Sequence, residues 1–166
     1  MIHNFTLNKF FQFNYFFELG QIFYDCTAYQ ISIEYLDKAI ELSTYLPINK
    51  NRLVKVYELR GNSKIRLGNY WDSISDFSKA IKIDPNDSFL YFWRGFAYES
   101  LEEYPKAVND LKIAQHLDPE FGLTKILLDY LEENLMLEKE GERHRRSPSI
   151  VVIFLPRLPF INIGLN

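Results

Sequence analysis

Apolar and small residues recur at helical spacing along the middle of the chain. Tyr57 and Gly61 lie four residues apart on one face of a first segment, which Gly68 interrupts. A second apolar stripe then runs over residues 74–81 with the i, i+3, i+4 spacing of a helix. Glycine suits the left-handed backbone that commonly ends a helix. The pattern therefore predicts a helix, a tight turn at Gly68 and a second helix that ends before Pro85.

The same pattern returns after a fixed interval. Five landmark pairs are each 34 residues apart: Tyr57/Tyr91, Gly61/Gly95, Tyr70/Tyr104, Ala80/Ala114 and Pro85/Pro119. A constant period of this length is typical of solenoids, in which helical hairpins stack because one hairpin cannot bury its own apolar face. Two adjacent repeats are predicted, at residues 54–87 and 88–121. Small residues at Gly61, Gly95, Ala80 and Ala114 are expected to let helices approach closely.

An earlier copy of the repeat precedes these two. Gly20 lies 41 residues before Gly61, which is seven residues more than the period. The extra residues follow Ala39, and we expect them to lengthen the second helix of this copy until a proline ends it near Tyr45. The first repeat is therefore predicted to be extended by seven residues and to cover residues 13–53.

Three further segments flank the repeats. Residues 1–12 are predicted to form a partly helical lead-in. Residues 122–142 are predicted to form a capping helix, because a stacked array needs a terminal element with a polar outer surface. The apolar face of this helix is expected to contain Leu123, Ile126, Leu127, Tyr130 and Leu131. Residues 143–166 form a tail, first basic and then apolar, that we expect to be poorly ordered.

With these landmarks the chain resembles the tetratricopeptide repeat family. The second repeat matches the family pattern at Tyr57, Arg60, Gly61, Tyr70, Phe77, Ala80 and Pro85, and the third at Tyr91, Arg94, Gly95, Tyr98, Tyr104, Ala107, Leu111, Ala114 and Pro119. Lys64 and Ser73 depart from it, standing where a tyrosine and an alanine are usual. The resemblance implies an all-α, right-handed superhelical solenoid of three helix-turn-helix repeats plus a C-terminal capping helix.

The resemblance also implies a concave groove lined by the first helix of each repeat. The residues expected to line it are Phe17, Gln21, Tyr24, Lys55, Asn62, Phe89, Phe92 and Phe96. The last three form an aromatic patch, for which two alternatives remain open. The patch could anchor an apolar side chain of a bound peptide or helix, or its rings could pack on the capping helix and other neighbouring helices.

The implied function is non-catalytic protein–protein interaction, as an adaptor or assembly scaffold that binds a peptide or helix in the groove. The alternative is a structural module that self-associates through residues 1–13 or through the apolar tail. Chaperone-binding members of the family hold the terminal carboxylates of a peptide with a clamp of Lys, Asn and Arg residues. The corresponding residues here are Phe17, Gln21, Leu59, Phe89 and Trp93. A two-carboxylate clamp is therefore not expected, and Arg60 and Arg94, one position away, are expected to face the partner helix of their hairpin.

Composition narrows the function further. The net charge of −3 and pI near 5.6 argue against a nucleic-acid partner, which usually needs a basic excess. No apolar run reaches the ~18 residues that a membrane span requires. The three histidines are far apart in the sequence, so no catalytic residue, metal or cofactor is expected. Cys26 is the one cysteine; we expect it to be a small buried residue in a protein of the reducing cytoplasm.

The tail leaves three alternatives open. It has a basic run at residues 143–146, followed by an apolar block at residues 150–155 and two prolines. It could stay disordered, fold back onto the aromatic part of the groove, or make a weak peripheral contact with a membrane or partner, helped by the basic run.

Overall fold

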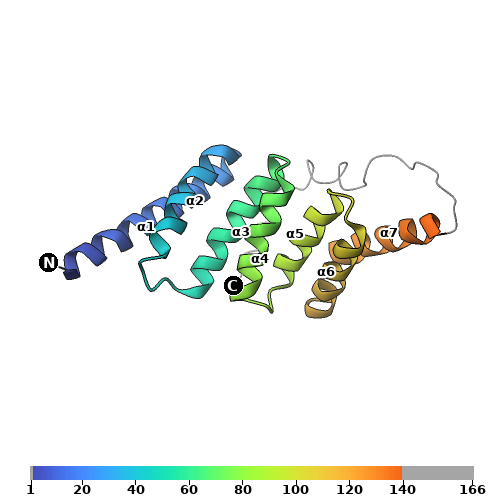
Figure 1. Ribbon diagram of the computed structural model, residues 1–166. Helices are drawn as coiled ribbons and strands as arrows, with labels where there is room; N and C mark the ends of the chain where they lie inside the picture. Colours follow the sequence, from blue (N-terminus) through green and yellow to red (C-terminus); the bar gives the residue numbers. More distant parts are fainter. Residues whose placement is uncertain (1, 140–166) are drawn as a thin grey trace.

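The computed structural model describes residues 2–139, so the predictions for the tail and for the last residues of the capping helix lie outside the described part of the chain. The helices are α1 (Ile2–Asp25), α2 (Tyr29–Ser43), α3 (Lys50–Arg66), α4 (Tyr70–Ile83), α5 (Ser88–Glu99), α6 (Tyr104–Leu117) and α7 (Gly122–Lys139). They follow one another along the array, and each packs mainly on its neighbours in sequence (Figure 1). No strand occurs within residues 2–139, and the all-α solenoid is confirmed.

Each hairpin is held together by a glycine on its first helix that lies under a large side chain of its second. A Cβ added to the glycine would lie 2.6 Å from Leu36 Cγ at Gly20, 2.9 Å from Phe77 Cζ at Gly61 and 3.1 Å from Leu111 Cγ at Gly95. A side chain at these positions would force the helices apart or displace the ring or leucine. The expected close approach at Gly61 and Gly95 is confirmed, and Gly20 follows the same rule.

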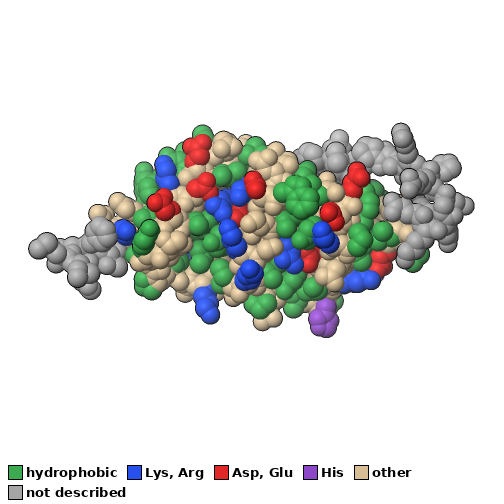
Figure 2. Space-filling model, in the orientation of Figure 1, with side chains coloured by type: hydrophobic (Ala, Val, Ile, Leu, Met, Phe, Trp, Pro, Cys, Tyr) green, Lys and Arg blue, Asp and Glu red, His purple; other side chains and the backbone are tan. Residues whose placement is uncertain are grey.

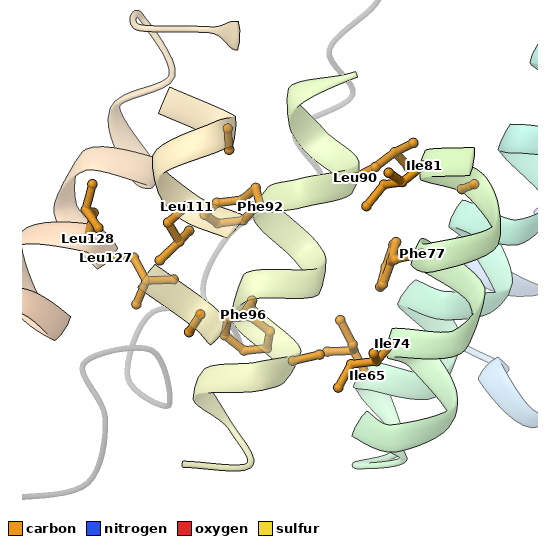
Figure 3. Packing of buried hydrophobic residues seen from close by; sticks show 14 of the residues in the cluster. Ile65, Ile74, Phe77, Ile81, Leu90, Phe92, Phe96, Leu111, Leu127 and Leu128 are labelled. Carbon is orange, nitrogen blue, oxygen red and sulfur yellow. The ribbon is translucent and has the colours of Figure 1, made fainter. Parts of the chain in front are cut away.

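Successive hairpins share one apolar core. Leu90 on α5 points toward α4 and lies near Ile81, whereas Phe92 and Phe96 leave the other side of α5 toward α6 and α7 (Figure 3). The same cluster continues to Leu127 on α7. A second cluster of buried apolar residues joins the first hairpin to α3. Because every hairpin buries its apolar face on the next one, the array is stabilised by neighbour contacts along its length.

The seven extra residues of the first repeat do not lengthen α2 as expected. In the repeat alignment, Ile83, the last residue of α4, corresponds to Leu42. α2 ends at Ser43 and is therefore one residue longer than α4. α3 instead begins at Lys50, four residues before the second repeat starts, whereas α5 begins at the first residue of the third repeat. The remaining two residues lengthen the loop between α2 and α3. α2 thus ends two residues before the expected end near Tyr45, and the prediction that the insertion lengthens this helix is wrong.

Side-chain hydrogen bonds explain where these two helices end and begin. The hydroxyls of Ser43 and Thr44 donate to the carbonyls of Ile40 and Glu41, at 2.7 and 2.8 Å. Such bonds compete with continuation of a helix. On the other side of the loop, the Asn49 side chain accepts a hydrogen bond from the backbone N–H of Asn51 at 2.9 Å. This cap lets α3 start one turn early.

The turn inside each hairpin uses a left-handed residue at the same repeat position. The φ angles are 60° at Thr27, 77° at Gly68 and 60° at Glu102. Glycine adopts this conformation freely, whereas a residue with a Cβ is strained there, most of all a β-branched one. The predicted turn at Gly68 is confirmed, and the other two repeats make the same turn without a glycine.

Two details differ from expectation. Ile126 is exposed, and Leu128 is buried in its place. Leu127 and Leu131 are buried as predicted, and Leu123 and Tyr130 are partly buried against the same cluster, so Ile126 is the one residue of the predicted face that is exposed. Cys26, expected to be buried, is exposed, because it lies in the turn after α1 and beyond the packed part of the hairpin. None of the helices in residues 2–139 has the length and apolar character that crossing a bilayer would require.

Replacing Glu102 by glycine is expected to stabilise the chain. The left-handed backbone costs a residue with a side chain roughly 1–2 kcal/mol, and the greater freedom of glycine in the unfolded state offsets about 0.5–1 kcal/mol of this gain. Glu102→Gly should therefore raise the free energy of unfolding by about 0.5–1 kcal/mol in urea denaturation.

The neighbouring Glu103→Gly is the matched control. Glu103 has a φ of −82°, which suits any residue, so glycine there should lower stability. Thr27→Gly should behave like Glu102→Gly, and Gly68→Ala should do the opposite. If Glu102→Gly and Glu103→Gly lowered the free energy of unfolding equally, the strain assigned to the left-handed backbone at Glu102 would be contradicted.

Candidate functional site

The first helices of the hairpins lie beside each other, with α1 against α3 and α3 against α5. We term their common surface, with the residue before α7, the first-helix face. Its side chains are those of Phe17, Glu18, Gln21, Tyr24, Arg52, Lys55, Glu58, Asn62, Arg66, Asp87, Phe89, Trp93 and Phe121. This surface is where the family resemblance places a binding groove.

At the α1 end of this face, Arg52 bridges the first two repeats. Its Nη2 lies 3.2 Å from Glu18 Oε1, and its guanidinium carbon lies 5.3 Å from the centre of the Phe17 ring. The ion pair is exposed, so its contribution to stability is small. Arg52 lies in the extra first turn of α3, and the insertion in the first repeat is therefore what brings this cation onto the face. Phe17 itself is buried beneath it.

The middle of the face carries partly buried charges. Lys55 Nζ lies 3.0 Å from Glu58 Oε1. Burial raises the pKa of the Glu58 carboxyl, although the charge and hydrogen bond of Lys55 partly oppose this change. Burial also raises the pKa of Asp87, which accepts a hydrogen bond from the Phe89 backbone N–H at 2.9 Å. Two carboxylates that are poorly hydrated in their charged form thus lie near one lysine.

Tyr24 and Arg66 form the other link between α1 and α3. Burial raises the pKa of the Tyr24 hydroxyl, while the charge of Arg66 and its hydrogen bond to Tyr24 act in the opposite direction. The Tyr24 ring also meets Tyr29 edge to face, with 5.7 Å between ring centroids. The tyrosine is therefore fixed in place and presents a polar edge toward α3.

The aromatic patch of the third repeat is largely covered. The Phe121 ring lies 4.7 Å from Phe89 and 5.0 Å from Phe92, centroid to centroid. Phe92 is 7% exposed and Phe96 is 4% exposed, and both point toward α6 and α7 (Figure 3). Of the two alternatives for these rings, packing is the one observed for Phe92 and Phe96. Phe89 and Trp93 keep part of their surface accessible.

The other predicted residues differ in how accessible they are. Lys55 is exposed, and Gln21 and Tyr24 are half-buried, so these three can reach a ligand. Asn62 is 7% exposed, and its side-chain oxygen has no hydrogen-bond donor within the described residues. Phe17 is buried under Arg52.

Several residues of this face escaped sequence reasoning. Arg52 lies on the face because α3 starts early, and a repeat alignment assigns that residue to the loop. Asp87 precedes α5, and only its role as the N-terminal cap turns its carboxylate toward Glu58 and Lys55. The repeat alignment places Trp93 only at a clamp position. Its aromatic ring next to two phenylalanines was the signal that could have identified it.

The arginines nearest the clamp positions point away from this face. Arg94 donates to both carboxylate oxygens of the buried Asp110, at 2.7 and 2.8 Å. Arg60 pairs with the buried Asp76 in the same way, one repeat earlier. Each pair joins the two helices of its own hairpin, as expected. Basic and acidic side chains also interleave across the side of the molecule shown in Figure 2.

The two buried aspartates keep their partner arginines charged. Burial alone would lower the pKa of the Arg60 and Arg94 guanidinium groups, but the hydrogen bonds and negative charges of Asp76 and Asp110 outweigh it, so that the pKa of each arginine is raised. Both arginines therefore stay charged and bound to their partner helix, and neither is free to hold a peptide carboxylate. In the described part of the chain, no three His, Cys, Asp or Glu side chains are grouped so as to hold a metal ion.

Comparison with known proteins identifies the repeats. One sequence profile of the tetratricopeptide repeat matches residues 54–87, and another matches residues 77–109. The Arabidopsis OM64 TPR domain has the same fold, with a TM-score of 0.68 and 23% identity, over 76% of this chain and 98% of that domain. Residues 54–109 therefore match the tetratricopeptide repeat, and the chain has the fold of a tetratricopeptide repeat domain.

Two other relatives bear on its class of function. The first TPR of Spaghetti (RPAP3), bound to the HSP90 peptide SRMEEVD, has a TM-score of 0.67 at 19% identity, over 75% of this chain and 94% of that one. The DnaJ homolog subfamily C member 7 homolog of Dictyostelium discoideum is 29% identical over 103 residues, 62% of this chain and 19% of that protein. The chain spans 18–21% of the length of the curated relatives it matches. Family and neighbours support a protein-interaction module.

The raised pKa of Glu58 predicts a pH-dependent effect of its removal. A carboxyl whose pKa is higher in the folded state favours folding at low pH, and this contribution is lost as the pH rises through the folded pKa. Glu58→Gln should therefore increase the free energy of unfolding, relative to the wild-type chain, more at pH 7 than near pH 4. Urea denaturation at the two pH values measures this difference.

Glu41→Gln, at an exposed position on α2, is the matched control. It should change stability by a similar amount at both pH values, because water hydrates that carboxylate. A Glu58→Gln effect that is equal at the two pH values, or larger at low pH, would contradict the assigned burial of this group.

Proposed function

We propose that the chain is a non-catalytic adaptor or assembly scaffold that binds a peptide or a helix of a partner protein on its first-helix face. The proposal involves no cofactor, metal or catalytic step, and it keeps the cytoplasmic setting expected from the sequence. Its main support is one observation: the partly buried carboxylates of Glu58 and Asp87 lie near each other at the start of α5, the helix that carries the half-buried rings of Phe89 and Trp93.

The chemistry of this region favours a particular kind of ligand. Glu58 and Asp87 have raised pKa values because burial removes water from their carboxylates. A cationic side chain of the partner would replace that lost hydration and strengthen the charged state of both groups. An apolar or aromatic side chain beside it would cover Phe89 and Trp93. We therefore expect a segment that places a lysine or arginine next to an apolar residue.

The anchor of this proposal is shifted from the one predicted by sequence. Phe92 and Phe96 are buried against the next helices and support the face from below. Phe89 and Trp93 provide the accessible aromatic surface instead. Gln21, Tyr24 and Lys55 lie within reach of the ligand on the two preceding repeats, where they contribute polar contacts that fix its direction.

A carboxylate clamp is not part of this proposal. Two of the clamp positions, Phe17 and Leu59, carry buried apolar side chains, and the nearby Arg60 and Arg94 are bound to Asp76 and Asp110. The carboxylates of Glu58 and Asp87 would also repel an acidic peptide. A peptide like SRMEEVD, which the Spaghetti (RPAP3) domain binds, is therefore expected to be a poor ligand.

The test uses a peptide selected on the full chain from a displayed random library. Its dissociation constant is measured by isothermal titration calorimetry. Trp93→Ala and Phe89→Ala should each weaken binding tenfold or more, because truncating a central aromatic anchor commonly costs about 2 kcal/mol. Circular dichroism and thermal melting establish that each variant remains folded.

Trp71→Ala is the matched control, since Trp71 is an exposed tryptophan on a second helix, α4. It should leave the affinity unchanged. The peptide SRMEEVD serves as a second probe and should show no saturable binding. The proposal fails if the selected peptide tolerates both aromatic substitutions, or if SRMEEVD binds and loses its affinity when its terminal carboxylate is amidated.

A further inference from the structure

Exposed apolar side chains are concentrated at the N-terminal end of the array. Eleven large apolar residues are exposed among those whose side chains the structure describes, and six of them lie on α1 or α2: Leu7, Phe10, Phe11, Tyr15, Ile22 and Ile31. A contiguous apolar surface on a folded chain usually marks a contact with another protein, so the side of α1 on which these residues lie together is of interest. The remaining question is what covers it.

The repeat alignment shows what this surface is shaped for. Tyr15 corresponds to Val56 in the second repeat and to Leu90 in the third. Tyr15 is 61% exposed, whereas Val56 and Leu90 are 0% exposed. Leu90 is buried because it packs toward α4, the second helix of the preceding repeat (Figure 3). Tyr15 therefore occupies a stacking position that no helix within residues 2–139 covers.

A second position shows the same difference. Ile22 corresponds to Ser63 and Ala97 in the later repeats. Ile22 is 52% exposed, whereas Ser63 and Ala97 are 0% exposed. The Ser63 hydroxyl lies 3.3 Å from that of Ser32 on α2, which shows directly that this position faces the preceding second helix. Two independent positions thus identify one side of α1 as an uncovered stacking surface.

We call this side of α1 the N-terminal stacking face and define it by Leu7, Phe11, Tyr15 and Ile22. These residues recur along one stripe of the helix. Glu18 lies within the stripe, between Tyr15 and Ile22, and Arg52 of the same chain already holds its carboxylate at 3.2 Å. The face is thus apolar apart from one carboxylate that an arginine of the same chain neutralises, and it fits another apolar helix.

A second copy of the chain can cover this face in two ways. In a head-to-tail arrangement, α7 of one copy would stack on α1 of the next and form an open filament. The outer side of α7, however, exposes Lys125, Asp129 and Glu133. That arrangement would bury charged groups against an apolar stripe, which is costly. In the other arrangement the two apolar stripes meet each other.

We propose that two copies of the chain pair through their N-terminal stacking faces, with α1 against α1 about a twofold axis. Such an interface is self-complementary and closed, so the assembly stops at a dimer. Four large side chains per copy, each with roughly half of its surface accessible, provide about half of the ~800 Å² per partner that is typical of a specific interface.

The pairing would leave the first-helix face of each copy open. Phe17 and Tyr24 leave α1 toward α3, where they meet Arg52 and Arg66, whereas the stacking face lies on another side of the helix. The dimer would therefore carry two equivalent binding faces. A partner with two copies of the recognised segment would be held more tightly by it than by a single chain.

Sedimentation of the purified full chain across a dilution series tests the proposal. The wild-type chain should sediment at twice its mass of 19.7 kDa at the higher concentrations. The double variant Tyr15→Glu with Ile22→Glu should raise the dissociation constant of the dimer at least about a hundredfold, since it would bury two charges from each copy in an apolar contact. Its helicity should be unchanged, because both side chains are exposed in the single chain.

The matched control is Ile126→Glu with Met136→Glu, which changes two exposed apolar residues on α7. This control should remain dimeric. A wild-type chain that stays monomeric at every concentration would overturn the proposal, as would a dimer that persists in the α1 variant. Larger assemblies that the α7 variant disperses would show head-to-tail stacking instead and would also overturn it.

Discussion

Each hairpin depends on the contact between a glycine of its first helix and a leucine or phenylalanine of its second. Gly20, Gly61 and Gly95 provide these contacts in the three hairpins. Because the large side chain fits only where no Cβ is present, the contact fixes the separation of the two helices and their relative position along the axis. Fully buried alanines recur in the second helices, at Ala39 and Ala80 for example, where successive hairpins meet.

This regular stacking gives the sides of the array different chemistry. The first helices share a face that carries partly buried carboxylates and accessible aromatic rings, and we propose that a partner binds there. Arg60 and Arg94 are bound to aspartates of their own hairpins and stabilise the repeats themselves. The two ends also differ, since α7 presents charged residues to solvent while α1 presents an apolar stripe. One packing rule thus produces both the first-helix face and an apolar stripe on α1 that no described helix covers.

Most of the fold could be predicted because the packing rule is visible in the sequence. Glycine, alanine and proline recur at a period of 34, and each has a steric reason to occupy its position. The seven-residue insertion could not be assigned to a particular helix, because its length is the same whichever helix contains it. Local hydrogen bonds of Ser43, Thr44 and Asn49 decide the outcome by ending α2 and starting α3 early.

The candidate site was less predictable than the fold. Repeat position gives the direction in which a side chain leaves its helix, but it does not say what lies in front of that side chain. Phe92 and Phe96 leave α5 in a direction where Phe121 and α7 cover them. Burial of Glu58 and Asp87 depends on how closely α3 and α5 approach, which is a property of the assembled array. Periodicity therefore predicts packing well, whereas accessibility requires the structure.

We conclude that the glycine contacts hold the two helices of each hairpin together, and that stability then passes between neighbouring hairpins through the apolar core they share. Hydrogen–deuterium exchange of Gly20→Leu, resolved by helix with mass spectrometry, tests it most directly. The leucine side chain at position 20 would push α1 away from Leu36 on α2. Amide hydrogen exchange should therefore become faster mainly in α1 and α2, with a smaller effect in α3 and none in α5, α6 or α7. Equal acceleration in all seven helices of residues 2–139, or unchanged exchange in α1 and α2, would contradict the claim.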